Sequence, residues 1–172
     1  SGTITIEKQI TVAWYSFFGI EVGNLDNDNY PEIFLGDDTS AKVIVFEYNG
    51  NDYINIKNFS YPTGMTVLDD LDVGDADGDG IDDLLICGNS MKLHLFNASA
   101  NNNYLNVWNS PAFEDFTQSC GIGDFNDNGK ADLIGANANG APEPGFYYHR
   151  FYEKDNNLVN DYTYTETWSY QS

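Results

Sequence analysis

Short apolar runs separated by polar turns recur along the chain, and no stretch shows the spacing of an amphipathic helix. Runs of this length, bounded by turn residues, are typical of β-strands. They fall into three sets of four. The first strands are predicted at 18–22, 69–73 and 119–122, the second at 33–36, 84–88 and 133–135, the third at 42–46, 92–96 and 147–151, and the fourth at 53–57, 104–108 and 162–166. The pattern therefore predicts an all-β protein.

The link between the first and second strand of each set is acidic and has the same spacing of oxygen-bearing residues. It reads NLDNDNYPE from Asn24, DADGDGIDD from Asp75 and DFNDNGKAD from Asp124. The loops begin about 50 residues apart, which marks an internal repeat. Four strands in a repeat of this length are typical of a β-propeller blade. We therefore predict one propeller segment over 1–172, with four-stranded antiparallel blades at roughly 13–60, 61–112 and 113–172.

An additional strand is predicted before the first blade. Residues 3–7 match the pattern of the fourth strand at 53–57, so residues 3–12 are interpreted as an extra N-terminal strand of the fourth type. Three blades are fewer than the four to eight of a closed propeller, and repeat units bury their faces only against neighbours. The chain is therefore expected to be part of a larger propeller or to be completed by a homo-oligomer.

The loops have the chemistry of a calcium site. Oxygen side chains occupy positions 1, 3, 5 and 9, and position 7 can offer its backbone carbonyl. The candidate ligands are Asn24, Asp26, Asp28, Tyr30 and Glu32 in the first loop, Asp75, Asp77, Asp79, Ile81 and Asp83 in the second, and Asp124, Asn126, Asn128, Lys130 and Asp132 in the third. Six to eight oxygen ligands suit Ca²⁺ better than Mg²⁺. Zinc would require His or Cys, which these loops lack. Three Ca²⁺ sites are therefore predicted.

An EF-hand and plain polar turns are the two alternatives to these sites. An EF-hand needs a Glu at position 12 and flanking helices, but that position is Leu35, Ile86 or Gly135 and the flanks are strand-like. Plain polar turns remain an alternative, which is weakest for the second loop because the four carboxylates at its ligand positions would repel one another without a cation. The expected order of affinity is second, first, third.

The turn at loop position 6 is expected to need a positive φ. Gly80 and Gly129 supply it in the second and third loops, and Asn29 fills that place in the first loop.

The pair Phe18-Gly19, the acidic loop after it and the small-residue turn after the second strand resemble FG-GAP repeats. These are calcium-bearing propeller blades of integrin α-subunits and of the related VCBS repeats. The resemblance covers nearly the whole chain, although only the first blade keeps Phe-Gly. It implies a propeller in which calcium is structural and in which ligands meet the face opposite the calcium loops.

The composition restricts the partners. The formal net charge is −20, which disfavours binding to nucleic acids and to anionic membranes, and no direct membrane insertion is expected. Calcium sites of millimolar affinity are filled outside the cell, so an extracellular or cell-surface location is expected.

The cysteines and histidines are weak signals. Cys87 and Cys120 lie in strands of successive blades, where they form either a disulfide or two buried thiols. His94 and His149 are predicted to share the strand position of Ile44, which favours packing over catalysis. No catalytic set is apparent, so the chain is not expected to be an enzyme.

The sequence therefore favours a non-catalytic, calcium-stabilised extracellular propeller module for adhesion or for recognition of a protein or glycan ligand. By the resemblance, Trp14, Tyr15, Tyr61 and Phe113 lie on the ligand face and are candidates for stacking on a ligand. Packing between blades is the alternative for each of them. The alternative function is the propeller region of a carbohydrate-active enzyme, such as a polysaccharide lyase.

Overall fold

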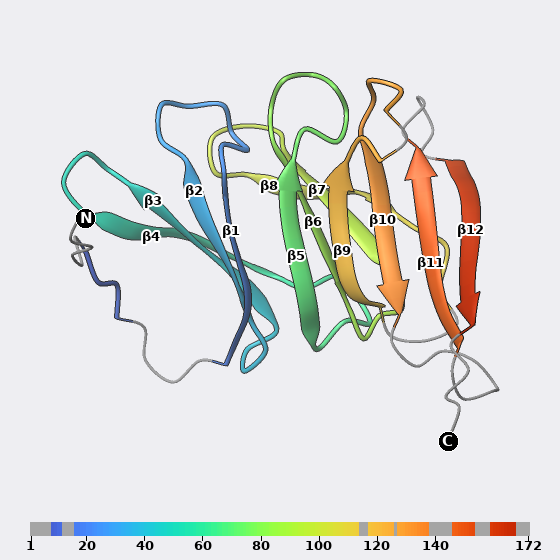
Figure 1. Ribbon diagram of the computed structural model, residues 1–172. Helices are drawn as coiled ribbons and strands as arrows, with labels where there is room; N and C mark the ends of the chain where they lie inside the picture. The colour runs from blue at the N-terminus through green and yellow to red at the C-terminus, as the bar shows by residue number, and fades with distance from the viewer. Residues whose placement is uncertain are drawn as a thin grey trace, which may run out of the picture.

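The computed structural model describes residues 8–11, 16–113, 117–125, 127–137, 146–153 and 159–167 (Figure 1). These residues form strands, turns and connections, and no helix occurs among them. The same residues accordingly contain no helix that is long and apolar enough to span a membrane. The extra strand predicted at 3–7 lies outside the described residues.

The strands form three separate four-stranded antiparallel sheets, each in simple sequence order. The first sheet holds β1 (Phe17–Gly23), β2 (Glu32–Asp37), β3 (Lys42–Tyr48) and β4 (Tyr53–Ser60); the second holds β5 (Leu68–Gly74), β6 (Asp83–Gly88), β7 (Leu93–Ala98) and β8 (Tyr104–Asn109); the third holds β9 (Thr117–Gly123), β10 (Asp132–Asn137), β11 (Phe146–Glu153) and β12 (Val159–Thr167). All twelve strands predicted within the three blades are present. The prediction of an all-β fold built from blade-like sheets is confirmed.

The pairing register is repeated from sheet to sheet. Phe46, Phe96 and Tyr152 pair with Ile33, Leu84 and Leu133, and each follows an irregularity in the pairing of its strand with the last strand of the sheet. These three residues therefore occupy the same position in their blades.

This register corrects the prediction for His149. Ile44 pairs with Leu35 and His94 with Ile86, but the corresponding residue of β11, opposite Gly135, is Arg150. His149 is one residue away from the predicted position. The connection before β11 is longer than in the other blades, so counting along the sequence misplaces the strand.

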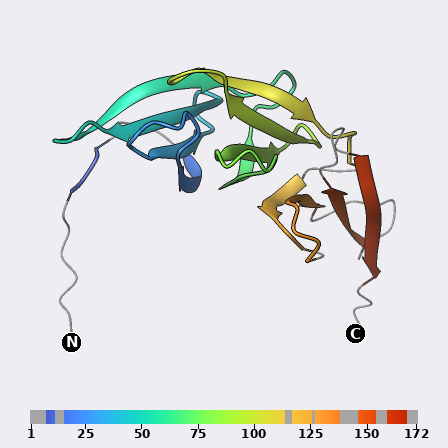
Figure 2. The ribbon, with the colours of Figure 1, turned by 90° about the horizontal axis from the view of Figure 1, so that it is seen from above.

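The sheets stand side by side in an arc, and β1, β5 and β9 are the strands through which successive sheets meet (Figure 2). The loops β1–β2, β5–β6 and β9–β10 all project from the same side of the arc, at the top of Figure 1. The β2–β3 and β6–β7 turns and the connection from β4 to β5 lie on the opposite side, at the bottom of Figure 1. The arrangement is that of propeller blades, and it places all three acidic loops together.

Two apolar clusters hold the arc together, one at each contact between sheets. The first contains Phe34, Val43 and Val45 from the first sheet with Leu84 and Ile86 from the second. The second cluster contains Leu85, Cys87, Leu93 and Leu95 of the second sheet with Leu133 of the third. Successive residues of β6 thus face opposite neighbours, as the two-residue period of a strand requires.

Polar contacts cross the boundary between the second and third sheets. Asp72 Oδ2 accepts a hydrogen bond of 2.7 Å from the Ile122 N–H, and Asp70 Oδ2 accepts one of 3.1 Å from the Cys120 N–H. The thiols of Cys87 and Cys120 are both free and lie at this boundary. The pKa of the Cys120 thiol is raised mainly by burial and secondly by a hydrogen bond with Cys87. The two cysteines are therefore neighbours across two sheets, and no disulfide joins them in this structure.

The first sheet has an apolar face that no other described sheet covers. Ile20 and Val22 of β1 are 62% and 56% exposed. Leu71, which corresponds to Ile20 in the second sheet, is 3% exposed because the first sheet packs against it. The first sheet thus carries the residues of an interface on a side where the described chain offers no partner sheet.

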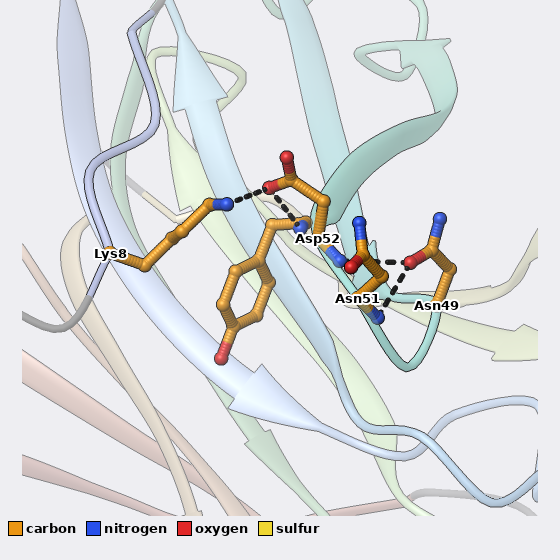
Figure 3. A network of polar contacts seen from close by, with 5 residues as sticks. Lys8, Asn49, Asn51 and Asp52 are labelled. Atoms are coloured by element: carbon orange, nitrogen blue, oxygen red, sulfur yellow. Dashed lines mark hydrogen bonds and ion pairs between the residues drawn. The ribbon is translucent and has the colours of Figure 1, made fainter.

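The N-terminal segment contacts the edge of this sheet at the β3–β4 turn. Lys8 Nζ lies 2.8 Å from Asp52 Oδ1, and Asn49 Oδ1 accepts hydrogen bonds from the N–H groups of Asn51 and Asp52 (Figure 3). The hydrogen bond from Lys8 lowers the pKa of Asp52. Because both side chains are well exposed, this pair positions the segment but stabilises it little.

Candidate metal centres

The last acid of each loop is buried. The exposed fractions of Glu32, Asp83 and Asp132 are 0%, 2% and 3%. Each accepts a hydrogen bond from the backbone N–H of the second loop residue: Leu25 to Glu32 Oε2 at 2.9 Å, Ala76 to Asp83 Oδ2 at 3.0 Å, and Phe125 to Asp132 Oδ2 at 2.9 Å. The three loops therefore share one internal frame, anchored on an acid at the start of the second strand.

The residue at loop position 5 forms the same turn in every loop. Asp28, Asp79 and Asn128 accept a hydrogen bond from the N–H two residues later, at 2.6, 2.9 and 2.8 Å. Turns of this kind fit Asp and Asn because the short side chain reaches its own backbone. This turn explains why Asp or Asn stands at position 5, and it does so without requiring an ion.

Left-handed backbone occurs at position 4 of all three loops, in Asn27, Gly78 and Asp127. Gly80 and Gly129 at position 6 also have positive φ values, of 85° and 82°, as predicted. The prediction that Asn29 fills this role in the first loop is wrong, because Asn29 is not left-handed. Asn and Asp tolerate this conformation better than other residues with a side chain.

The second loop gathers three carboxylates. Asp75, Asp77 and Asp83 each offer an oxygen within 4.8 Å of the others. Asp79, the other predicted ligand with a carboxylate, is not in this group. Asp75 also accepts hydrogen bonds from the Gly78 and Gly80 N–H groups, at 2.6 and 2.9 Å, which closes the loop around it.

The first loop gathers a different set. Asp26 and Asp28 lie together with Glu47, again within 4.8 Å. Glu47 lies on β3, directly opposite Glu32 of β2. It was not among the predicted ligands, because it is far from the loop in sequence and only the pairing register brings it there.

Several oxygens at the first loop are buried without a partner. Asn24 Oδ1, Glu32 Oε1 and Glu47 Oε2 make no hydrogen bond. Burial raises the pKa of Glu32 to about 8, and burial likewise raises the pKa of Asp83 to about 7. A buried polar atom without a partner costs free energy, and a hard cation accepts such oxygens as ligands. The donor set therefore fits a calcium ion at the first loop, and the three carboxylates of the second loop fit one equally.

The third loop is described only in part. Asp124 accepts hydrogen bonds from the N–H groups of Asn128 and Gly129 at 3.0 and 2.6 Å, as Asp75 does from the corresponding amides. Asn126 lies outside the described residues, so the predicted ligand set of this loop is incomplete here. Lys130 lines a cavity of about 360 Å³ together with Asp75 and Asp77, which places the second and third loops side by side. The expected use of the Tyr30, Ile81 and Lys130 carbonyls stays a prediction.

Two of the four residues predicted to stack on a ligand, Tyr61 and Phe113, are buried. Tyr61 is 7% exposed and its hydroxyl donates to Asp38 Oδ1 at 3.2 Å. Phe113 is 4% exposed and packs in the cluster between the second and third sheets. Both correct the ligand assignment in favour of packing between blades. Trp14 and Tyr15 lie outside the described residues.

The predicted ligand face nevertheless contains a pocket. It has a volume of about 450 Å³ and lies between the connection from β4 to β5 and the β6–β7 turn. Its lining residues are mostly polar: Pro62, Thr63, Gly64, Ser90, Lys92, His94, Asn106 and Asn109. This pocket is on the side of the arc opposite the acidic loops.

His94 forms the buried wall of this pocket. It is 3% exposed, its Nε2 lies 2.7 Å from Ser90 Oγ, and its Nδ1 is hydrogen-bonded to Asn109 Oδ1. Burial lowers the pKa of His94, which favours the neutral ring. With the proton on Nδ1, Nε2 accepts the Ser90 hydroxyl hydrogen, which is the arrangement by which a histidine can act as a base on serine.

One comparison with known proteins identifies a repeat. Residues 24–86 match the family model of the FG-GAP-like repeat. No curated protein matches the chain. The matched segment runs from the first acidic loop through the first contact between sheets to β6, so it includes two of the three loops. Together with the blade-like sheets, this match identifies residues 24–86 as an FG-GAP-like repeat region of the β-propeller type.

Proposed function

We propose that this chain is a calcium-stabilised, non-catalytic propeller module of an extracellular or cell-surface protein, and that it serves adhesion or recognition of a protein or glycan ligand. The observation that carries the proposal is the burial of an acid at each loop, above all Glu32 at the first loop, which is 0% exposed and whose Oε1 has no partner. A buried charge without compensation is strongly destabilising. A bound calcium ion would neutralise these acids and pin the first hairpin of each blade.

The position of the loops supports a structural role for the ion. All three loops lie on one side of the arc, at the top of Figure 1. The polar pocket lined by Ser90, Lys92 and His94 lies between the β4–β5 connection and the β6–β7 turn, which are on the opposite side. A ligand bound at the pocket would therefore be separate from the ion sites. Hydroxyl, amide and ammonium groups in the lining suit a polar ligand, such as a sugar or a polar peptide segment.

The uncovered face of the first sheet supports a further proposal about partners. Ile20 and Val22 correspond to residues that form the contact between the first and second sheets. We infer that another blade packs there, either in a larger propeller or in a second copy of the chain. Light scattering after size exclusion distinguishes a monomer from an oligomer. Glu substitutions at Ile20 and Val22 should dissociate any oligomer.

The first experiment is a thermal melt of the full chain in excess chelator, in millimolar calcium and in millimolar magnesium. Binding to the native state raises the melting temperature by mass action. A large increase with calcium and a small one with magnesium would support the proposal. Equal melting temperatures in chelator and calcium would contradict it. The recognition part is tested separately by a glycan array with Lys92→Ala as the matched variant.

A second candidate function is acyl-ester hydrolysis at the pocket, which the contact of Ser90 with His94 specifically favours. It ranks second because both nitrogens of the buried His94 ring are hydrogen-bonded within the protein, as in a structural histidine. Labelling of Ser90 by a fluorophosphonate, absent in Ser90→Ala, would support hydrolysis. No labelling of the wild-type chain would exclude a nucleophilic serine there.

A further inference from the structure

The first and second acidic loops build their carboxylate groups differently. The group at the second loop, Asp75, Asp77 and Asp83, comes from one continuous stretch of chain. The group at the first loop takes Asp26 and Asp28 from the loop and Glu47 from β3. The residue of β7 that corresponds to Glu47 is Asn97, because each follows the phenylalanine that pairs with the start of the second strand. The first blade therefore has an extra acid where the second blade has an amide.

Buried oxygens without partners occur at the first loop, beside this group of carboxylates. Glu32 is 0% exposed; its Oε2 is bonded to the Leu25 N–H, and its Oε1 has no partner. Asp26, Asp28 and Glu47 are the acids close enough to repel the charge of Glu32. Glu47 Oε2 is likewise buried and without a partner. The three carboxylates of this group lie within 4.8 Å of one another, and together with the unpartnered Glu32 oxygen they form a binding site for a hard divalent cation.

The second sheet reaches into the same site. The Asn102 N–H, in the β7–β8 turn, donates a hydrogen bond of 3.0 Å to Asp26 Oδ2. The Asn102 side chain also hydrogen-bonds to Glu47. Asn102 has a φ of 57°, so the turn is bent to present both groups to the first sheet. One residue of the second blade thus contacts two carboxylates of the first loop's site.

We propose that Glu47 is a ligand of the cation at the first loop and that this cation, through Asp26 and Glu47, fastens the first sheet to the β7–β8 turn of the second. The inference rests on the proposed calcium function and adds a ligand from outside the loop. The ion holds the two carboxylates that hold Asn102, so filling the site also orders the contact between blades. The first loop then binds calcium at least as tightly as the second, in contrast to the order expected from the loops alone.

The test is a calcium titration of the full chain followed by amide NMR signals. Asn29 reports on the first loop and Gly80 on the second. Glu47→Gln removes the charge and keeps the shape, and it should weaken filling of the first loop by about tenfold or more while leaving the second within about twofold. In the wild type, calcium should slow hydrogen exchange of the Asn102 amide. In Glu47→Gln at the same calcium concentration, this protection should be lost.

A reciprocal variant keeps the inference testable if Glu47→Gln folds poorly. Asn97→Glu gives the second blade the acid of the first, and it should tighten filling of the second loop. Unchanged affinity of the first loop in folded Glu47→Gln, or no tightening in Asn97→Glu, would overturn the role of this strand position while the response of Gly80 still upholds the proposed function. No response of either loop in the wild type would overturn both.

Discussion

The backbone N–H of Asn102 donates a hydrogen bond of 3.0 Å to Oδ2 of Asp26, a residue 76 positions earlier and in another sheet. A second contact runs the opposite way, from the Asn24 N–H to Asp82 Oδ2 at 2.8 Å. Both contacts lie on the side of the arc that carries the acidic loops. The boundary between the first two sheets is therefore held by apolar side chains along its length and by loop-to-loop hydrogen bonds on this side.

The equivalent residues Leu71 and Ile20 should respond very differently to truncation. Leu71 is 3% exposed between two sheets, so Leu71→Ala should lower the free energy of unfolding by about 2–5 kcal/mol. Ile20 is 62% exposed, so Ile20→Ala should change it by less than about 0.5 kcal/mol. Urea titrations at low protein concentration measure both. Similar losses would mean that the face of β1 is already covered in solution.

Asp79 and Asn128 provide a matched pair for the ion sites. Each accepts the same hydrogen bond within its turn, at 2.9 and 2.8 Å, so Ala at either position removes that bond equally. Asp79→Ala also removes a charge from the more acidic loop. In saturating calcium it should lower the melting temperature more than Asn128→Ala does, by about 2–4 °C for each kcal/mol of lost binding. Equal decreases would contradict a tighter second site relative to the third.

Stability without calcium should fall as the pH rises. Burial raises the pKa of Glu32 from 4.5 to about 8 and that of Asp83 from 3.8 to about 7. The native state therefore retains protons that the unfolded chain releases. Their contribution to stability is complete below the unfolded pKa and is lost as the pH rises through about 7–8.

Melts in chelator between pH 5 and pH 8 measure this dependence. The decrease should be smaller in Glu32→Gln, which has no proton to lose. In calcium the trend should reverse, because the ion binds only the deprotonated acids. A melting temperature that rises with pH in chelator, equally in the wild type and in Glu32→Gln, would count against the buried state of this acid.

Gly23 and Gly74 end the first strands of successive blades and differ in how closely the next sheet approaches. A Cβ on Gly23 would lie 2.2 Å from Val73 Cγ1, whereas a Cβ on Gly74 would lie 3.2 Å from Ile122 Cγ2. Gly23→Ala should therefore destabilise by about 1–3 kcal/mol, as overpacking typically does. Gly74→Ala should cost clearly less. Denaturant unfolding of the two variants in calcium tests the difference, and an equal cost would place the close contact elsewhere.

The strand pattern and the loop spacing were sufficient to predict the blades. They rest on local signals, namely turn residues and a two-residue period, and the sheets follow from sequential pairing. Glu47 could not be found in this way, since its place at the first loop depends on which residue of β3 faces Glu32. The error at His149 has the same origin, because the longer connection before β11 hides its register. Local patterns predict elements, whereas sites shared by two strands depend on pairing.

The aromatic residues show a different limit. Tyr61 and Phe113 lie in connections, where exposed aromatic rings often bind ligands, but both are buried between sheets. A ring in a connection can fold back over the edge of its own blade, and sequence alone does not distinguish the two placements. The polar lining of the pocket at Ser90 and His94 gave no motif, because its residues come from three separate segments.

The uncovered face of β1 gives the arc a direction. If Ile20 and Val22 of one copy contact the opposite face of a sheet in another copy, the contact joins two different surfaces. The assembly then still exposes one surface of each kind, as a single copy does. Head-to-tail addition of this kind ends only if the rotation between sheets closes a ring, and otherwise it continues as a filament. With a formal net charge of −20, each added copy also meets repulsion that salt weakens. Ionic strength and calcium together should then control how far such an assembly grows.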